Sequence, residues 1–375
     1  MKSKFFILMI FIIYAGHLTA GSEFTGVFTQ INPSATNVAF GIQSGTAYIW
    51  GNNPLNSWSN PALLAYNQGL SWGWSRDPWF EDVIKGMYIN SSYLSYVNQD
   101  FGILIPMINA NGKFGTTIDY GEQEAYDPNG NNFYTFHSHE TCSRFAVAKK
   151  LFRINILPNS ENTDSFTLSA GYDFRYITSN LPFFVSDSLD LDIVHGTMHG
   201  LGLLGHFIHH QRLNSKHSFL TFEATAGYYQ MNLFKSELSY ESGDEPLPYG
   251  KRFGLTGKIS YHFGNSISLP LSFLQENISF CYVYDTEKLG DYDSEWGNGY
   301  ELSFFNTFFL RWGEFHDEQG HIEGNTSGVG VKFNINSVVY FEYNYATFPG
   351  GELQAEQRKT DLMISFDLMK VLKKK

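Results

Sequence analysis

Much of the C-terminal half of the chain alternates between large apolar residues and small or polar ones. Ile278, Phe280, Tyr282 and Tyr284, for example, are separated by Ser279, Cys281 and Val283. A period of two predicts β-strands with two different faces. The same pattern occurs in Phe166–Tyr176, Leu220–Tyr228, Phe253–Tyr261, Tyr300–Trp312, Gly328–Asn334, Val339–Tyr345 and Asp361–Leu368. With weaker segments between Leu70 and Leu368, the chain contains about fourteen candidate strands, within the range of bacterial barrels.

Composition narrows the class of all-β protein. Aromatic residues make up 17% of the chain and charged residues only 17%, whereas soluble domains average roughly 25% charged residues. After Ala20 no stretch approaches the roughly 20 consecutive apolar residues of a transmembrane helix. The apolar residues are instead dispersed singly along strands. Composition alone leaves a membrane barrel and a large secreted β-sandwich array open.

The two strand faces favour the barrel. The polar face carries isolated charges, among them Glu301, Arg311, Lys332 and Glu342, as a polar lumen would allow. The opposite face is large and aromatic, and too few amphipathic helices exist to cover it. A closed antiparallel transmembrane β-barrel leaves no strand edge unpaired in lipid. Polar connections, the longer of them expected to be extracellular, separate the strands at Asp127–Asn132, Pro158–Asp164, Ser242–Tyr249, Glu287–Gly297, His316–Thr326 and Pro349–Lys359.

The N-terminus predicts export. Lys2 and Lys4 precede an apolar stretch, Phe5–Gly16, and a small-residue cleavage site at Ala20, which is the layout of a secretory signal peptide rather than an anchor helix. We therefore divide the chain into a signal peptide (1–20), an N-terminal plug or hatch (21–67), a barrel (68–369) and a basic periplasmic tail (370–375). The hatch is rich in Gly, Asn, Ser and Ala, does not alternate, and has no lipid-facing pattern.

Charge and cysteine content exclude other classes. The net charge of −12 becomes −14 without Lys2 and Lys4, since 23 basic residues then face 37 acidic ones. Nucleic acid is therefore not an expected partner, because it requires a basic footprint. Two cysteines, Cys142 and Cys281, form neither a disulfide framework nor a Cys-type zinc site. One bridge and two separate thiols both stay open.

With these elements placed, a family resemblance follows. The stretch "ATNVAFGIQSGTAYIWGNNPLNSWSNPALLAY" (Ala35–Tyr66) resembles the N-terminal signature of FadL-type outer-membrane proteins, in which Asn-Pro-Ala precedes the first strand. The stretches "GYELSFFNTFFLRWGEF" (Gly299–Phe315) and "SGVGVKFNINSVVYFEYNYA" (Ser327–Ala346) resemble the PorV/PorQ branch. In the middle, "CSRFAVAKKL", "SAGYDFRYI" and "LDLDIVHGTMHGLGLLGHF" fit in order. Asn52-Asn53 replaces the usual Asp-Asp, and the Lys-rich tail replaces a terminal aromatic residue.

The resemblance implies a fourteen-stranded barrel in the bacterial outer membrane with the N-terminal segment folded into the lumen. Asn60, Pro61, Ala62 and Leu63 would then form the turn and gate of the hatch. Pro61 fixes the backbone there, and the Asn60 side chain can cap the turn. PorV/PorQ-type members serve type IX secretion and handle cargo proteins. FadL-type members pass hydrophobic small molecules.

Candidate chemistry is weak elsewhere. His195 and His199 share one strand face, and His206 and His210 share one, but no Asp, Glu or Cys lies between His195 and His210, and a metal site usually has three or four ligands. "HSHE" (His137–Glu140) has the same status. Neither Gly-x-Ser-x-Gly nor His-Glu-x-x-His occurs. We expect no catalytic residue, no metal and no cofactor.

Three hypotheses follow. The first is a secretion barrel of PorV/PorQ type, whose partners would be secretion-machinery proteins or cargo. The alternative is a FadL-type transporter for hydrophobic small molecules such as fatty acids, which requires an apolar pocket between hatch and wall. The third, disfavoured, is a barrel enzyme. Outer-membrane lipid is the expected surrounding in all three.

Overall fold

The computed structural model describes most of the chain after the predicted signal peptide. The described residues are 24–41, 45–79, 86–126, 132–158, 162–185, 188–213, 218–240, 243–263, 277–290, 294–317, 322–335, 338–350 and 356–367. The predicted signal peptide (1–20) and basic tail (370–375) lie outside them.

Short helices come first and strands follow. The hatch contains the 3-10 helix η1 (Val27–Gln30), the α-helix α2 (Ala35–Val38), and the 3-10 helices η2 (Pro54–Trp58) and η3 (Pro61–Tyr66). The strands are β1 (Gly69–Pro78), β2 (Tyr88–Asn98), β3 (Phe101–Pro106), β4 (Gly115–Tyr126), β5 (Asn132–Pro158), β6 (Asn162–Val185), β7 (Ser188–Arg212), β8 (Phe219–Met231), β9 (Glu237–Tyr240), β10 (Gly243–Pro246), β11 (Gly250–His262), β12 (Asn277–Leu289), β13 (Glu295–Phe304), β14 (Phe308–Asp317), β15 (Ile322–Ile335), β16 (Val339–Pro349) and β17 (Glu356–Phe366).

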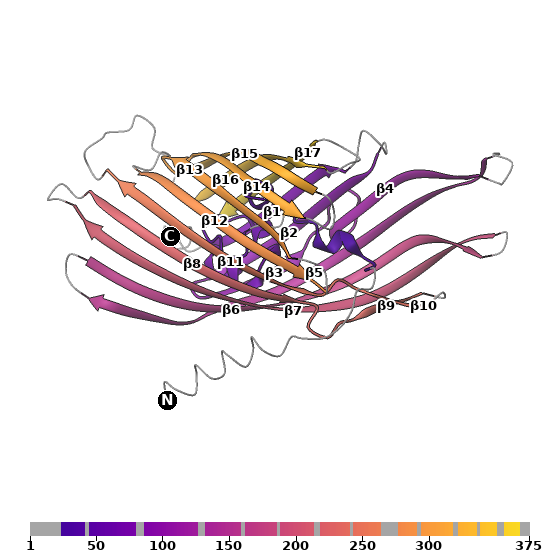
Figure 1. Ribbon diagram of the computed structural model, residues 1–375, viewed down its shortest axis with the longest axis horizontal. Helices are drawn as coiled ribbons and strands as arrows, with labels where there is room; N and C mark the ends of the chain where they lie inside the picture. Colours follow the sequence, from indigo (N-terminus) through magenta and orange to yellow (C-terminus); the bar gives the residue numbers. More distant parts are fainter. Residues whose placement is uncertain are drawn as a thin grey trace.

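The long strands close into one antiparallel barrel (Figure 1). β1 pairs with β17 on one side and with β2 on the other, which closes the sheet. The sheet has 15 strands, but β3 and β4 pair with the same neighbours, β2 and β5, and occupy one position. The barrel therefore has 14 strand positions, and the predicted fold class is confirmed.

One predicted strand was wrong. Tyr300–Trp312 alternates throughout, yet the structure divides it into β13 and β14 around a tight turn at Phe305–Thr307. Phe305 and Asn306 have φ angles of 58° and 49°, and Phe304 pairs with Phe308 across the hairpin. A three-residue turn preserves the odd–even parity, and this turn contains neither Gly nor Pro. Alternation therefore could not reveal it.

The two faces of the wall differ as the alternation predicts. Phe280, Tyr282, Leu310 and Trp312 are exposed on the outside. Their inward neighbours are buried, and many are small or polar. The predicted lumenal charges Glu301, Arg311, Lys332 and Glu342 are all buried. The outer face thus has the apolar surface that a lipid environment requires.

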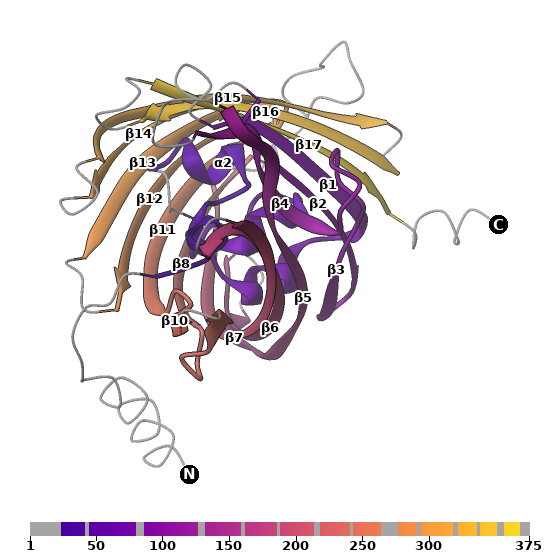
Figure 2. The same ribbon diagram turned by 90° about the vertical axis from the view of Figure 1, so that its right-hand side faces the viewer.

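The hatch lies inside the barrel, as Figure 2 shows when the barrel is viewed towards one end. Its first described residues lie near the end of the barrel where β1 finishes. There Thr25 N donates at 3.0 Å to Pro246 O of β10, in the connection between β8 and β11 at the same end. The hatch ends at the opposite end, where β1 begins at Gly69. We refer to these as the Pro78 end and the Gly69 end. None of the helices in the described ranges is long and apolar enough to cross a membrane.

The turn between β13 and β14 generates a stability prediction. A non-glycine residue in the left-handed region costs roughly 1–2 kcal/mol. We expect Phe305→Gly to raise the free energy of unfolding, relative to Phe305→Ala, by about 1 kcal/mol, measured by urea unfolding in lipid vesicles. Both variants remove the ring, so the difference reports only the backbone. If Phe305 belonged to a continuous strand, glycine would instead lower stability by roughly 0.5–1 kcal/mol.

Candidate functional site

The hatch is fixed by side chains of the wall that bind its backbone. The Asp361 carboxylate accepts from Ala35 N at 2.7 Å, and the Asp285 carboxylate accepts from Gly45 N and Thr46 N, both at 2.9 Å. The Thr326 hydroxyl donates to Ala39 O at 2.8 Å. A short, irregular segment leaves many backbone groups without helix or sheet partners, and each costs energy if buried unpaired. The wall supplies these partners.

Glycines in the wall allow the hatch backbone to approach closely. A Cβ atom at Gly313 would lie 2.6 Å from Phe40 O, and one at Gly299 would lie 2.7 Å from the Cα of Phe40. Similar close contacts with the hatch occur at Gly73, Gly171, Gly202, Gly227, Gly254 and Gly328. Any side chain at these positions would push the hatch out of reach of its hydrogen-bond partners.

The Asn-Pro-Ala turn lies where hatch and wall meet most closely. Asn60 caps η3, since its Oδ1 accepts from Ala62 N at 3.0 Å. Its Nδ2 donates to Thr46 O within the hatch and to Leu203 O of β7, both at 3.1 Å. Pro61 and Ala62 are buried, the latter against Gly171. Leu63, also buried, belongs to a small apolar cluster with Ala47, Ile49 and Leu204.

Asn53, one of the two asparagines that replace the usual Asp-Asp pair, caps a hatch helix. Asn53 is the N-cap of η2, and its Oδ1 accepts from Leu55 N at 3.1 Å. An Asn or an Asp can serve equally as an N-cap. The replacement is therefore compatible with the same hatch geometry.

Sequence reasoning missed a buried charge cluster. Asp173 Oδ2 accepts from Arg144 Nε at 2.7 Å and from Arg175 Nε at 3.1 Å. Arg144 Nη2 also donates to Ser57 O at 2.8 Å. The guanidinium carbons of Arg175 and Arg144 lie 4.4 and 5.6 Å from the ring centroid of Trp58. The available signal was that Asp173 and Arg175 have the inward parity of β6, but only the fold brings Arg144 beside them.

Two hatch tyrosines are also anchored to the wall. Tyr48 OH donates to Glu301 Oε2 at 2.8 Å, and the pKa of Tyr48 is raised well above its usual value by burial and by the Glu301 charge. Tyr66 OH accepts from Ser169 Oγ at 3.2 Å, and burial raises the pKa of Tyr66 to about 12. Both phenols therefore stay neutral at physiological pH.

Apolar side chains run along the barrel axis on one side of the lumen, on either side of the Arg144–Asp173–Arg175 cluster. Leu55, Trp58 and Leu64 of the hatch pack in one continuous cluster with wall side chains from β2 to β8 and with Leu289 of β12. Members nearest the Gly69 end include Leu64 and Val97, and members at the Pro78 end include Met87, Leu238 and Leu247. We call this cluster the apolar column. The opposite side, from β11 to β17, carries most of the carboxylates that hold the hatch.

The wall beside the apolar column is interrupted. β3 ends at Pro106 and β4 begins at Gly115, although their partners Tyr93 and Ser92 are consecutive in β2. Residues 107–114 leave the sheet as a small hairpin with a bridge between Ile108 and Phe114. On the other side, the pairing with β5 stops at Leu104↔Ala146 and resumes at Thr116↔Cys142. We call this interruption the seam. Among the described residues, it is the only position in the barrel that is occupied by two separate strands, β3 and β4.

Asn109 holds this hairpin to the outside of the wall. Its Nδ2 donates to Gly115 O at 3.1 Å and to the Thr117 hydroxyl at 2.9 Å. Its Oδ1 accepts from Asn111 N at 3.0 Å. Ile108 and Phe114 are exposed at the base of the hairpin.

An apolar groove of about 510 Å³ lies on the outer surface at the seam. It is lined by Ile105, Pro106, Phe114, Ser143, Phe145, Phe174 and Tyr176. Behind it, on the inner face of the same wall, lie Leu104, Cys142 and Ala146 of the apolar column, with the buried Arg144 between the last two. Outer groove and inner column are therefore separated by one layer of wall whose strand pairing is incomplete.

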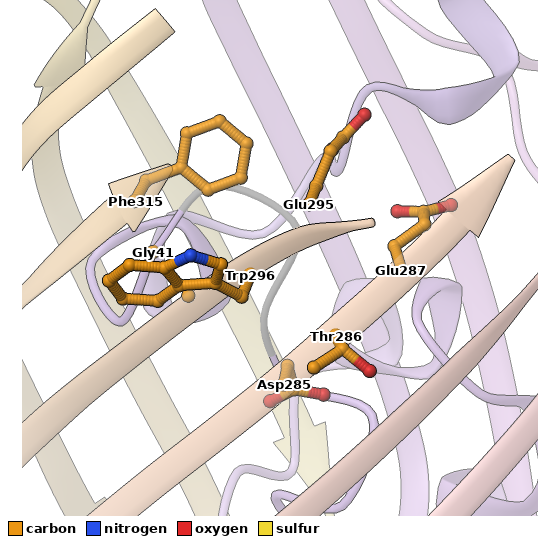
Figure 3. Close-up of a pocket in the computed structure, with 8 residues that line it drawn as sticks. Gly41, Asp285, Thr286, Glu287, Glu295, Trp296 and Phe315 are labelled. Carbon is orange, nitrogen blue, oxygen red and sulfur yellow. The ribbon is translucent and has the colours of Figure 1, made fainter. Parts of the chain in front are cut away.

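A second cavity is much smaller. It lies at the Pro78 end between Gly41 of the hatch and strands β12 and β13, and its volume is about 10 Å³. Figure 3 shows Asp285, Glu287 and Glu295 around it. Glu287 Oε1 is 2.8 Å from Arg252 Nε. A water molecule needs roughly 10–15 Å³, so this cavity has no room for an organic ligand.

The histidines of β7 lie on opposite faces of the wall, as their odd and even positions in the strand predict. His195 and His199 face outward against Tyr176 and Tyr172, whereas the inward His206 lies 3.2 Å from Glu223. His210 also faces inward, with Nδ1 3.0 Å from the Thr221 hydroxyl. Across the described ranges, His, Cys, Asp and Glu form no group of three that could hold a metal ion.

The other candidate residues, in "HSHE" and at the two cysteines, also form no common site. In "HSHE", His137 pairs with Asp119 at 2.7 Å, while Glu140 is buried and accepts from Tyr120 OH at 2.6 Å. Cys142 and Cys281 are buried, free thiols, so of the two alternatives the structure supports separate thiols.

The close contact at Phe40 generates a prediction about the hatch. We expect Gly299→Ala, whose Cβ would meet only Phe40 among its three nearest neighbours, to lower the free energy of unfolding by roughly 1–3 kcal/mol, as overpacking does, and to expose the hatch to chymotrypsin. Trypsin would not report this, because the predicted hatch contains no Lys or Arg. Gly257→Ala in β11 is the matched control, since a Cβ there meets nothing within 4 Å. Equal behaviour of the two variants would contradict the proposed contact.

Among known proteins, the chain shows similarity to solved structures. No family model matches the sequence, and no curated protein matches it. The chain is similar to the Ralstonia pickettii toluene transporter TbuX (TM-score 0.38, 12% identity, 90% of this chain and 98% of that chain). It is also similar to the Pseudomonas putida toluene transporter TodX (0.38, 11%, 87% and 95%) and to a Pseudomonas aeruginosa FadL homologue (0.31, 9%, 89% and 98%). Likenesses of this strength carry no argument about the ligand.

Proposed function

We propose that the chain is a bacterial outer-membrane barrel of FadL-like type that binds a hydrophobic small molecule at the seam and passes it between the lipid and the apolar column. The groove of about 510 Å³ at the seam carries this proposal. It favours what the sequence left as the alternative, small-molecule transport, over the secretion role.

The outer face supports a membrane location. Large apolar side chains project from strands all round the barrel, for example Phe145 of β5, Ile259 of β11 and Val329 of β15, each more than 40% exposed. Exposed apolar surface on this scale would aggregate in water and is stable in lipid. A hydrophobic molecule dissolved in the bilayer would therefore reach the groove by diffusion within the membrane.

The groove has the size and chemistry of a small-molecule site. Ligand sites typically span about 300–1,000 Å³ and are mostly apolar with a few polar groups. Here three phenyl rings, Phe114, Phe145 and Phe174, surround the groove. Ser143 and Tyr176 supply the hydroxyl groups in its lining. Aromatic walls suit a flat or aliphatic apolar molecule, since such faces pack through dispersion and offset stacking.

The inner side continues the same chemistry. A molecule that crosses the wall at the seam would meet Leu104 and Tyr93, and then Trp58 and Leu64 of the hatch. Each is a member of the apolar column, and the route avoids the carboxylates on the opposite side, while Arg144 and Arg175 lie against Trp58 on this side. The sequence led us to expect an apolar pocket between hatch and wall. The column is an apolar surface at that place, but hatch side chains fill it, and the groove at the seam lies on the outer side of the wall.

We assign to Asn60, Pro61, Ala62 and Leu63 the role of a closed gate across the barrel axis. Movement along the axis would break the hydrogen bonds of Asn60 to Thr46 and Leu203. It would also separate Ala62 from Gly171. Passage through the seam breaks none of these contacts.

A photolabelling experiment tests the proposed function. The full-length protein in lipid nanodiscs would be labelled with the apolar probe 3-trifluoromethyl-3-phenyldiazirine, with and without excess toluene. We expect labelled Phe114, Phe145 and Phe174 to be protected by the competitor. Ser143→Trp should fill the groove and reduce this competed labelling about tenfold, which corresponds to about 1.4 kcal/mol.

Val329→Trp is the matched control, because Val329 is an exposed outer-face residue on β15, away from the groove. Labelling of the groove that is insensitive to competitor, or equal effects of the two tryptophan variants, would refute the proposed function.

One observation favours the second candidate, type IX secretion of PorV/PorQ type. The hatch is bound through its backbone on several sides, which suits a barrel that works through protein contacts and never opens. Co-purification of a secretion-machinery protein or a cargo protein with the full-length chain, together with uncompeted photolabelling, would support this candidate over the first.

A further inference from the structure

Two hydroxyl groups lie at one edge of the groove at the seam. Ser143 of β5 and Tyr176 of β6 both line the groove, and they are directly opposite each other in the strand pairing. Residues opposite each other in an antiparallel pair have Cβ atoms about 4.5–5.5 Å apart on the same face of the sheet. The two hydroxyl-bearing side chains are therefore neighbours on the outer surface of the wall.

The next pair of outward residues along the same two strands is apolar. Phe145 and Phe174 also line the groove, lie one pair closer to the Gly69 end, and are directly opposite each other. Their ring centroids are 6.4 Å apart. The groove thus has a phenyl end and a hydroxyl end, and the hydroxyl end is the one nearer the Pro78 end of the barrel.

The two hydroxyls have complementary capacity for hydrogen bonds. Ser143 Oγ donates its proton to Phe114 O at 3.0 Å, so it can only accept a further hydrogen bond. The Tyr176 hydroxyl has no hydrogen-bond partner among the described residues and can donate one. The ring of His195 stacks on that of Tyr176, with centroids 5.6 Å apart and planes at 17°, which restricts where the hydroxyl points. One hydroxyl of a ligand can therefore donate to Ser143 and accept from Tyr176.

The lining also restricts the charge of the ligand. None of the seven residues that line the groove has a side chain that is charged at neutral pH. A carboxylate or ammonium group would lose hydration there without an ion-pair partner, which costs far more than burying a neutral hydroxyl that is hydrogen-bonded. The groove therefore favours a neutral polar group over a charged one.

We propose that the groove binds a small phenol, which is a flat aromatic ring with one neutral hydroxyl group. The ring packs against Phe145 and Phe174, and the hydroxyl donates to Ser143 Oγ and accepts from Tyr176 OH. This assignment rests on the proposed function, because it names the class of hydrophobic molecule that the groove takes. An aromatic hydrocarbon of the same shape fits the phenyl end but makes neither hydrogen bond.

Competition between two matched ligands tests the proposal on the unmodified protein. Photolabelling of the full-length protein in nanodiscs would be competed with 4-methylphenol and with toluene, which differ only in the hydroxyl group. Because toluene enters lipid more readily, the two would be compared at measured concentrations in the bilayer. One net hydrogen bond is worth about two- to tenfold in affinity. We expect 4-methylphenol to protect Phe145 and Phe174 at a bilayer concentration about tenfold below that of toluene.

Tyr176→Phe removes the hydroxyl and keeps the ring. It should shrink the advantage of 4-methylphenol to about threefold or less, because one of two hydrogen bonds is lost, and should leave protection by toluene unchanged. Tyr172→Phe is the matched control. Tyr172 is an outward tyrosine of the same strand, 39% exposed against 40% for Tyr176, but it does not line the groove and its hydroxyl lies 2.5 Å from His199 Nδ1.

A third competitor, 4-methylanisole, tests the bond to Ser143. It has the same oxygen as 4-methylphenol without the proton, so it cannot donate to Ser143 Oγ. We expect it to protect the groove less well than 4-methylphenol at the same bilayer concentration.

Failure of this proposal can be distinguished from failure of the proposed function. Equal protection by 4-methylphenol and toluene would overturn the proposal, as would equal behaviour of Tyr176→Phe and Tyr172→Phe or of 4-methylanisole and 4-methylphenol. In each case protection by toluene would leave the seam as a site for a hydrophobic molecule. The absence of protection by every competitor would remove the function itself.

Discussion

The hatch depends on hydrogen bonds from its backbone to side chains of the barrel wall. The described part of the hatch contains four short helices, which cannot satisfy all of its amides and carbonyls, and inside a barrel it is kept from bulk water. Asp361 and Asp285 accept from hatch amides, while Thr326 donates to a hatch carbonyl. Such contacts form only if the backbones of hatch and wall approach closely, which explains the glycines at Gly299 and Gly313. The charges in the lumen, the small residues in the strands and the irregular backbone of the hatch therefore depend on one another.

That arrangement divides the lumen into two sides with different chemistry. The carboxylates of β12 and β17 hold the hatch by directional bonds, which break at a cost of about 1.5–3 kcal/mol each when the acceptor is charged. Strands β5 to β7 also bind the hatch by directional bonds, such as that of Arg144 to Ser57 O, but the apolar column beside them is held by non-directional packing, which can exchange one apolar partner for another of similar size. The seam and its groove adjoin the second side. A hydrophobic ligand can thus be accommodated where contacts are exchangeable, while the directional bonds keep the hatch in place.

Sequence patterns predicted the fold more completely than they predicted the functional site. Alternation identified the wall, its inward charges and its outward aromatics, because a period of two maps directly on a sheet that faces lipid on one side and a lumen on the other. The same parity concealed the turn at Phe305, since a three-residue turn leaves alternation intact. The Asn-Pro-Ala turn was found from its residues, because Asn60 and Pro61 act locally. The Arg144–Asp173–Arg175 cluster and the groove depend on partners many residues apart. Only the register of the closed barrel brings them together.

The central claim is that a hydrophobic molecule is handled at the seam while the hatch stays in place. Hydrogen exchange of the full-length protein in nanodiscs, with and without saturating toluene, tests it most directly. Met107 N and Gly115 N, which bond to Ser92 O and Met107 O at the seam, should exchange faster with ligand. Ala35, Gly45 and Thr46, whose amides bind Asp361 and Asp285, should keep their protection. Loss of protection in the hatch with no change at the seam would contradict the account.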